Sequence, residues 1–140
     1  MNPEQIRYRG SLPAQDTVSP SEEVRPLVLV VDDEPVMRSV MMRILREHYR
    51  VVASADGRDA FATFGVVGEA IAAVVTDVEM PRMDGLGLAE LINHLAAPPP
   101  ILFVSASRPQ SVELPGPFLP KPFSPDALVH AVDDLLASKQ

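Results

Sequence analysis

Residues 71–85 read IAAVVTDVEMPRMDG and decide the fold of this 140-residue chain. Ile71 to Thr76 form a run of apolar and small side chains, which is typical of a strand covered on both faces of a sheet. The run ends at Asp77, and Pro81 and Gly85 punctuate the loop that follows. A carboxylate therefore stands at the end of a strand that we predict to be buried.

Similar apolar runs lie on both sides of this segment and alternate with helical periods. Strands are predicted at 27–31, 51–53, 71–76, 101–104 and 118–120. Amphipathic helices are predicted from Pro35 to Leu45, from Asp56 to a stop at Gly65, from Leu88 to Leu95, and from Ser124 as N-cap to Leu136. This alternation predicts an α/β fold, a doubly wound five-stranded parallel sheet with helices on both faces.

The connection between the last two strands departs from this regular pattern. Only twelve residues, 106–117 (ASRPQSVELPGP), separate Ser105 from Phe118, and a parallel crossover needs about a dozen residues including its helix. Prolines and a glycine shorten the helical part further. We therefore predict that the fourth helix is stunted or missing, with at most about one or two turns near 110–114.

Composition limits the remaining possibilities. Residues 1–25 show no sustained apolar period, so we predict an N-terminal tail followed by one domain over residues 26–140. The absence of cysteine excludes disulfides and thiolate sites, and the net charge of −7 argues against direct nucleic-acid binding. No apolar run is long enough for membrane insertion, and the polar start is not a signal peptide. A cytoplasmic location follows by elimination.

Polar side chains follow four of the five predicted strands. Asp32 and Asp33 follow the first strand, Asp77 the third, Ser105 the fourth and Lys121 the fifth. Ligand sites of open parallel sheets lie outside the carboxyl ends of their strands. We therefore expect three carboxylates, one hydroxyl and one ammonium to converge there.

Three neighbouring carboxylates repel each other, and each pair about 4 Å apart costs roughly 4 kcal/mol at an effective dielectric constant near 20. Lys121 offers one compensating charge, and Mg²⁺ suits a few carboxylates together with phosphate oxygens. The set fits phosphoryl transfer to a carboxylate. Taken singly, each residue also has an ordinary interpretation as a helix cap, a turn residue or a solvated charge. The coincidence at four strand ends favours a site.

The motifs at these strand ends resemble the receiver domains of two-component response regulators. The matching segments are VLVVDDEP (28–35), VVTDVEMPRMDG (74–85), ILFVSAS (101–107) and FLPKPF (118–123), in family order. The resemblance spans residues 27–137 and implies a flavodoxin-like fold.

The resemblance also implies a role for each matching position. Asp77 is the expected phosphoacceptor, and Asp33 and Asp77 are the expected direct ligands of the Mg²⁺ cofactor. Asp32 would bind the ion through water, and the main-chain carbonyl of Glu79 would complete the protein ligands. Ser105 and Lys121 would contact the phosphoryl group. Phe118 occupies the position of an aromatic rotamer switch, although an ordinary core aromatic is an equally good interpretation, and Pro122 matches a cis-proline position.

The function implied is that of a single-domain response regulator. It would accept a phosphoryl group from a histidine kinase or phosphotransfer protein and switch its affinity for a downstream protein partner that the sequence does not identify. It would be no enzyme beyond self-catalysed phosphoryl transfer and slow autodephosphorylation, and it would be a monomer or weak dimer. The alternatives are a phosphorylation-independent receiver-like binding module and a Mg²⁺-dependent phosphohydrolase, which this small chain disfavours because it leaves no substrate pocket.

Overall fold

The computed structural model of the chain describes residues 24–107 and 113–138. The five strands are β1 (Leu27–Val31), β2 (Arg50–Ser54), β3 (Ile71–Asp77), β4 (Ile101–Ser105) and β5 (Phe118–Pro120). They form one parallel sheet in the order β2-β1-β3-β4-β5. The predicted doubly wound α/β fold is therefore confirmed.

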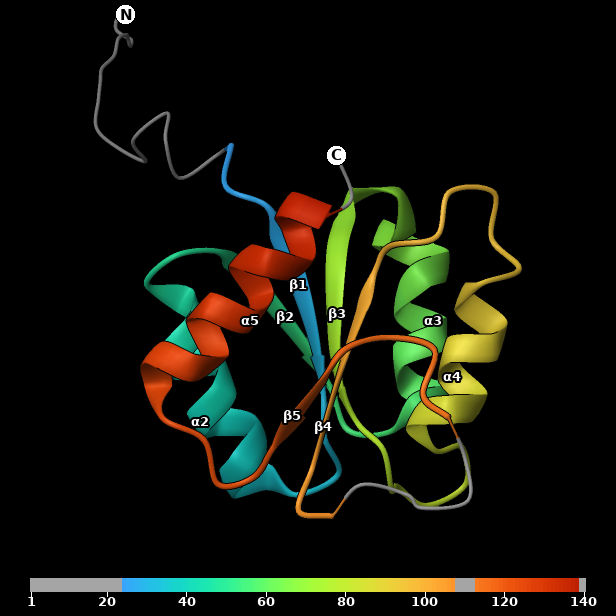
Figure 1. The fold of residues 1–140 in the computed structure, drawn as a ribbon. Coiled ribbons are helices and arrows are strands. Elements are labelled where there is room, and N and C mark those ends of the chain that lie inside the picture. The colour runs from blue at the N-terminus through green and yellow to red at the C-terminus, as the bar shows by residue number, and fades with distance from the viewer. Residues whose placement is uncertain (1–23, 108–112, 139–140) are drawn as a thin grey trace, which may run out of the picture.

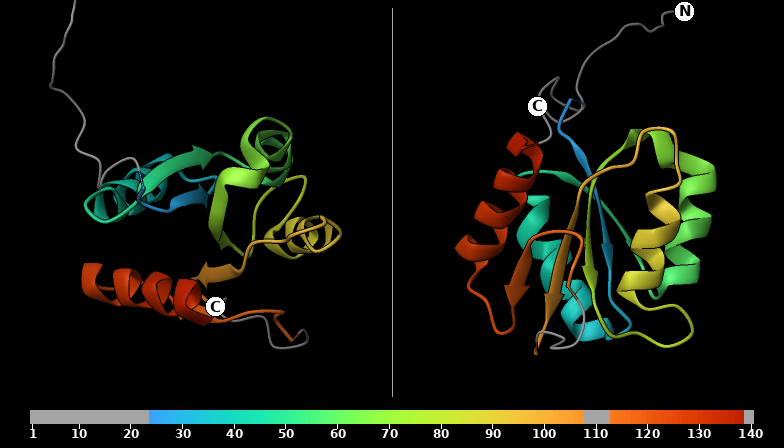
Figure 2. Two further views of the ribbon diagram at one scale, coloured as in Figure 1. Left: turned by 90° about the horizontal axis from the view of Figure 1, so that it is seen from above. Right: turned by 45° about the vertical axis from the view of Figure 1, so that its right-hand side comes forward.

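The helices pair off on the two faces of this sheet (Figures 1 and 2). They are α2 (Pro35–Arg46), α3 (Gly57–Val67), α4 (Gly85–Ile92) and α5 (Pro125–Ser138), with a short 3-10 turn η1 (Gly68–Ala70) after α3. Helices α2 and α5 cover one face, and α3 and α4 cover the other. None of the helices in the described part of the chain has the length and apolar character needed to cross a membrane.

The two cores follow from the alternation of side chains along each strand. All five residues of β1 are buried. Leu27, Leu29 and Val31 lie in the core under α3 and α4, whereas Val28 and Val30 lie in the core under α2 and α5. Successive side chains of a strand point to opposite faces of the sheet, so an unbroken apolar strand fills both cores.

Two predicted helix ends are wrong. Gly65 does not stop α3, which continues to Val67, because no glycine in the described part of the chain takes the left-handed conformation of a C-terminal glycine. Helix α4 ends at Ile92 and not near Leu95. Beyond Ile92 the backbone forms hydrogen bonds of the 3-10 type, in which the N–H of His94 donates to the carbonyl of Leu91 and the N–H of Leu95 donates to that of Ile92. Leu95 still packs on the core.

The crossover from β4 to β5 agrees with the predicted stunted or missing fourth helix. Residues 106–107 and 113–117 are not helical, and 108–112 lie outside the described residues, as do residues 1–23 of the predicted tail. Leu114 is buried and joins the core under α3 and α4. A Cβ atom on Gly116 would lie 2.6 Å from the carbonyl oxygen of Ile101. The backbone of the crossover thus packs directly on β4, without a helix between them at these residues.

This close approach predicts that Gly116→Ala destabilises the domain by about 1–3 kcal/mol, because backbone atoms must move to admit the methyl group. The matched control is Gly65→Ala, whose Cβ would meet no atom within 4 Å. It should stabilise α3 by about 0.5–1 kcal/mol. Urea unfolding of both variants tests the contrast, and equal effects of the two substitutions would contradict it.

A second prediction concerns Asp56, the N-cap of α3. Its carboxylate accepts hydrogen bonds from the main-chain N–H of Asp59 at 2.8 Å and from the guanidinium of Arg82. The Asp59 bond first, and then the Arg82 bond, holds the pKa of Asp56 below its usual value. A lowered pKa means that ionised Asp56 stabilises the fold above about pH 4, the ordinary value for Asp, and that this contribution is lost as the pH falls through the folded-state pKa.

The variant Asp56→Ser keeps a good N-cap but removes the charge. Its deficit in unfolding free energy relative to wild type should therefore be constant above about pH 4 and shrink below it. Urea unfolding across a pH series measures this difference, and a deficit that does not change with pH would contradict the expectation.

Candidate functional site

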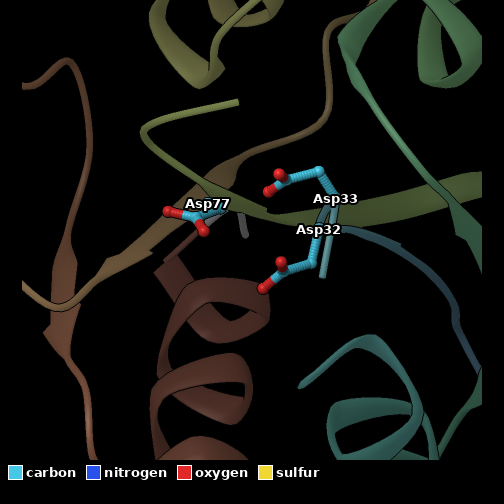
Figure 3. A group of neighbouring side chains, drawn as sticks. All are labelled: Asp32, Asp33 and Asp77. Carbon is cyan, nitrogen blue, oxygen red and sulfur yellow. The ribbon is translucent and has the colours of Figure 1, made fainter. Parts of the chain in front are cut away.

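The topology brings the predicted side chains to one edge of the sheet. Strands β1, β3 and β4 are neighbours, and Asp77 at the end of β3 pairs in register with Val104 of β4. Asp32 and Asp33 follow directly after β1. Figure 3 shows the carboxyl groups of Asp32, Asp33 and Asp77 gathered at these strand ends. One oxygen of each lies within 4.8 Å of the others, so the predicted carboxylate cluster is confirmed.

Lys121 supplies the counter-charge. Its Nζ atom donates to Oδ2 of Asp32 at 3.0 Å and to Oδ2 of Asp77 at 3.2 Å. In the described ranges, 24–107 and 113–138, it is the only cation that forms an ion pair with the cluster. The peptide bond from Lys121 to Pro122 is cis, as the resemblance predicts. One ammonium facing three carboxylates leaves an uncompensated negative charge when all are ionised.

The three carboxyl groups differ in their surroundings. Asp32 is fully buried, Asp77 is half-buried and Asp33 is exposed. Burial raises the pKa of Asp77, and the charge and hydrogen bond of Lys121 only partly oppose this rise. Burial also disfavours the charged form of Lys121, but its bonds to Asp32 and Asp77 outweigh burial and raise the pKa of the ammonium. Lys121 is therefore held as a cation by the same carboxylates that it pairs.

Main-chain contacts fix the position of Asp32. Its Oδ1 atom accepts the N–H of Glu34 at 2.9 Å, and its own N–H donates to the carbonyl of Ser54 at 3.2 Å. The guanidinium of Arg38, one turn into α2, donates to the Asp32 carbonyl at 2.7 Å. Sequence reasoning did not find Arg38, because its partner is a main-chain atom that leaves no pattern of residue types.

The loop after β3 folds back over the backbone of the acceptor. The N–H of Glu79 donates to Oδ1 of Asp77 at 3.3 Å, and the N–H of Gly85 donates to the carbonyl of Val78 at 2.8 Å. A Cβ atom on Gly85 would lie 2.3 Å from the carbonyl oxygen of Asp77. Glycine at this position thus lets α4 begin directly against the acceptor. Glu79 itself is exposed, and its carbonyl remains a predicted ligand.

Ser105 and Phe118 lie on adjoining strands. Ser105 is buried at the end of β4, and its carbonyl accepts the N–H of Lys121 at 2.8 Å. Phe118 pairs in register with Phe103 of β4 and packs, half-buried, against the core under α3 and α4. Ser105 therefore lies beside the end of β5, next to Lys121. The roles predicted for Ser105 and Phe118 remain predictions.

A contact between two loops was missed at the sequence level. Arg82, in the loop after Asp77, forms an ion pair with Asp56 at the start of α3. The two residues are 26 positions apart, and neither stands in a spacing that would reveal the pair.

Comparisons with known proteins agree with this geometry. A family model described as the response regulator receiver domain matches residues 28–133. A putative two-component response regulator of Arabidopsis thaliana, ARR21, is 31% identical over 132 residues, which cover 91% of this chain and 22% of the plant protein. The chain spans about half the length of several other curated relatives.

Solved structures share the fold. The chemotaxis response regulator CheY4 of Vibrio cholerae superposes with a TM-score of 0.70 at 27% identity, covering 81% of this chain and all of CheY4. The receiver domain of the hybrid histidine kinase CckA gives a TM-score of 0.69 at 32% identity, covering 79% of this chain and 98% of that domain. The chain therefore belongs to the response regulator receiver domain family, whose members are the phosphoacceptors of two-component signalling.

Proposed function

We propose that Asp77 accepts a phosphoryl group from a histidine kinase or phosphotransfer protein, and that this modification changes the affinity of the domain for a protein partner. The observation that carries the proposal is the convergence of Asp32, Asp33 and Asp77 at the carboxyl ends of neighbouring strands, with the Lys121 ammonium paired to Asp32 and Asp77. This arrangement supports the proposal, because a half-buried carboxylate lies beside groups that could hold a divalent cation and a phosphate.

The donor set fits Mg²⁺. Its side-chain donors are carboxylate oxygens, which lie within 4.8 Å of one another, and their excess negative charge requires a cation. In the proposed site Asp33 and Asp77 would bind the ion directly, Asp32 would bind it through water, and the Glu79 carbonyl would complete the protein ligands. When bound, Mg²⁺ would neutralise charge on the phosphoryl oxygens.

Asp77 and Lys121 carry the chain's own part of the transfer step. An Oδ atom of Asp77 forms a bond to phosphorus while the phosphorus–nitrogen bond of the donor phosphohistidine breaks, and the imidazole leaves with the bonding electron pair. Lys121, held as a cation, pairs with the charge that the phosphoryl oxygens carry. The backbone of Asp77 packs directly against Gly85, which limits the movement of the acceptor residue.

The donor protein must approach this edge of the sheet. Helix α2 begins there, and its outer surface exposes Val36 and Val40, which are 72% and 40% accessible. Residues four apart lie on one face of a helix. Apolar contact with this face would hold a donor next to Asp77.

The output is proposed to start at Ser105. Its hydroxyl would turn toward the phosphoryl oxygens, and the neighbouring strand β5 would respond through the packing of Phe118. Phenylalanine has no hydroxyl, so any signal at this position must be a change of packing.

The first test is phosphorylation of the isolated chain by a small acyl phosphate donor with Mg²⁺. Intact-mass spectrometry should show one added phosphoryl group on wild type and none on Asp77→Asn, because the amide is not a nucleophile for this step. Omission of Mg²⁺ should also abolish the modification.

The matched control is Asp134→Asn, which removes an exposed carboxylate from α5 and should be modified like wild type. A phosphorylation-independent binding module predicts an unmodified wild type instead. That result, or modification of Asp77→Asn to the wild-type extent, would overturn the proposal.

A further inference from the structure

The loop between Asp77 and α4 contains an unfavourable backbone conformation. Arg82 has a φ angle of 67°, and it is the only residue, glycines included, with a positive φ in the described part of the chain. This left-handed region suits glycine and, less well, asparagine, whereas the Cβ of arginine crowds the following carbonyl there. Arginine at this position therefore needs contacts that offset the cost.

The contact that Arg82 makes is with Asp56. Its guanidinium pairs with Oδ2 of Asp56, whose other oxygen caps α3 by accepting the N–H of Asp59. The side chain of Asp56 is 8% exposed and that of Arg82 is 61% exposed. The exposed side chain of Arg82 thus reaches from the loop to the buried carboxylate of Asp56 at the start of α3.

Backbone packing beside this pair is equally close. A Cβ atom on Gly57 would lie 2.6 Å from the carbonyl oxygen of Met83, so the first turn of α3 rests directly on the residue after Arg82. At the other end of the loop, the N–H of Gly85 donates to the Val78 carbonyl. The loop between Asp77 and α4, which includes Glu79, is therefore held by backbone contacts with α3 and with Val78.

The turn that receives Arg82 also touches the other half of the acidic cluster. Ser54, two residues before Asp56, accepts the N–H of Asp32 through its carbonyl. One short turn, residues 54–57, thereby contacts both the Asp32–Asp33 segment and the loop after Asp77.

We infer that Asp56 and Arg82 form a positioning pair, which holds the loop carrying Glu79 in register with the Asp32–Asp33 segment and so sets the affinity of the acidic cluster for a divalent cation. The inference rests on the proposed function in that it takes Mg²⁺ as the cation. Neither residue is a proposed ligand; both act through the position of the loop.

The sign of the mutational effects separates positioning from simple charge. Removal of the positive Arg82 near an acidic cluster should strengthen cation binding by Coulomb's law, and removal of the negative Asp56 should weaken it. Loss of positioning weakens binding in both cases. The two explanations thus predict opposite results for Arg82.

The experiment measures the Mg²⁺ dissociation constant of the full chain by calorimetry for Arg82→Ala, Asp56→Ser and the double variant. Each single substitution should weaken binding about tenfold, in the range for residues that orient metal ligands, and the double variant should be little worse than either. Arg58→Ala is the control, since Arg58 is an exposed cation of α3 near Asp56 and should leave binding unweakened.

Amide hydrogen exchange without Mg²⁺ measures the order of the loop independently of cation binding. Val78, Met83 and Gly85 should exchange faster in both single variants, whereas the amides of β1 should not change. Arg82→Gly relieves the left-handed strain yet removes the pair, so it should fold stably and still bind Mg²⁺ weakly.

Stronger Mg²⁺ binding by Arg82→Ala, or unchanged binding in both single variants while wild type is still phosphorylated, would overturn the inference alone. Absence of Mg²⁺ binding by wild type would overturn it together with the proposed site. A wild type that binds Mg²⁺ but takes no phosphoryl group refutes only the proposed function, and a tenfold loss in both variants would still support the positioning pair.

Discussion

The crowding of three carboxylates at one edge of the sheet is the constraint on which the site depends. Strands β1 and β3 pair in parallel, so Asp32 and Asp77 at their carboxyl ends meet at the same edge of the sheet. Their repulsion is offset by the two hydrogen bonds of Lys121, which arrives from β5. The same arrangement has two effects on ionisation. Burial raises the pKa of Asp77, and pairing with Asp32 and Asp77 raises the pKa of Lys121 and keeps it charged.

The rest of the molecule holds these charges in place mainly through its backbone. Gly85 lets α4 start against the acceptor strand β3, and Gly57 lets α3 pack on Met83 in the loop that follows β3. The crossover to β5 needs no helix at its described residues, because Leu114 fills the core and Gly116 packs on β4. The receiver fold thus keeps its acidic edge complete although only twelve residues, 106–117, connect β4 to β5.

Much of this arrangement could be predicted from the sequence, because it is carried by periodicity. Apolar runs give the strands, and the rule that parallel strands end together predicts the meeting of Asp32, Asp33 and Asp77 with Lys121. The helix end at Gly65 was wrong because a glycine stop depends on a backbone angle that residue type alone does not determine. The pair between Asp56 and Arg82 could not be predicted, since it joins two loops through tertiary packing and follows no period.

The central claim is that Asp77, and no other carboxylate of the cluster, receives the phosphoryl group. Borohydride reduction of the phosphorylated chain converts an aspartyl phosphate to homoserine, which peptide mass spectrometry then locates. Homoserine is expected at position 77, with Asp32 and Asp33 unchanged. Homoserine at position 32 or 33, or none in a chain whose mass shows the added phosphoryl group, would contradict it.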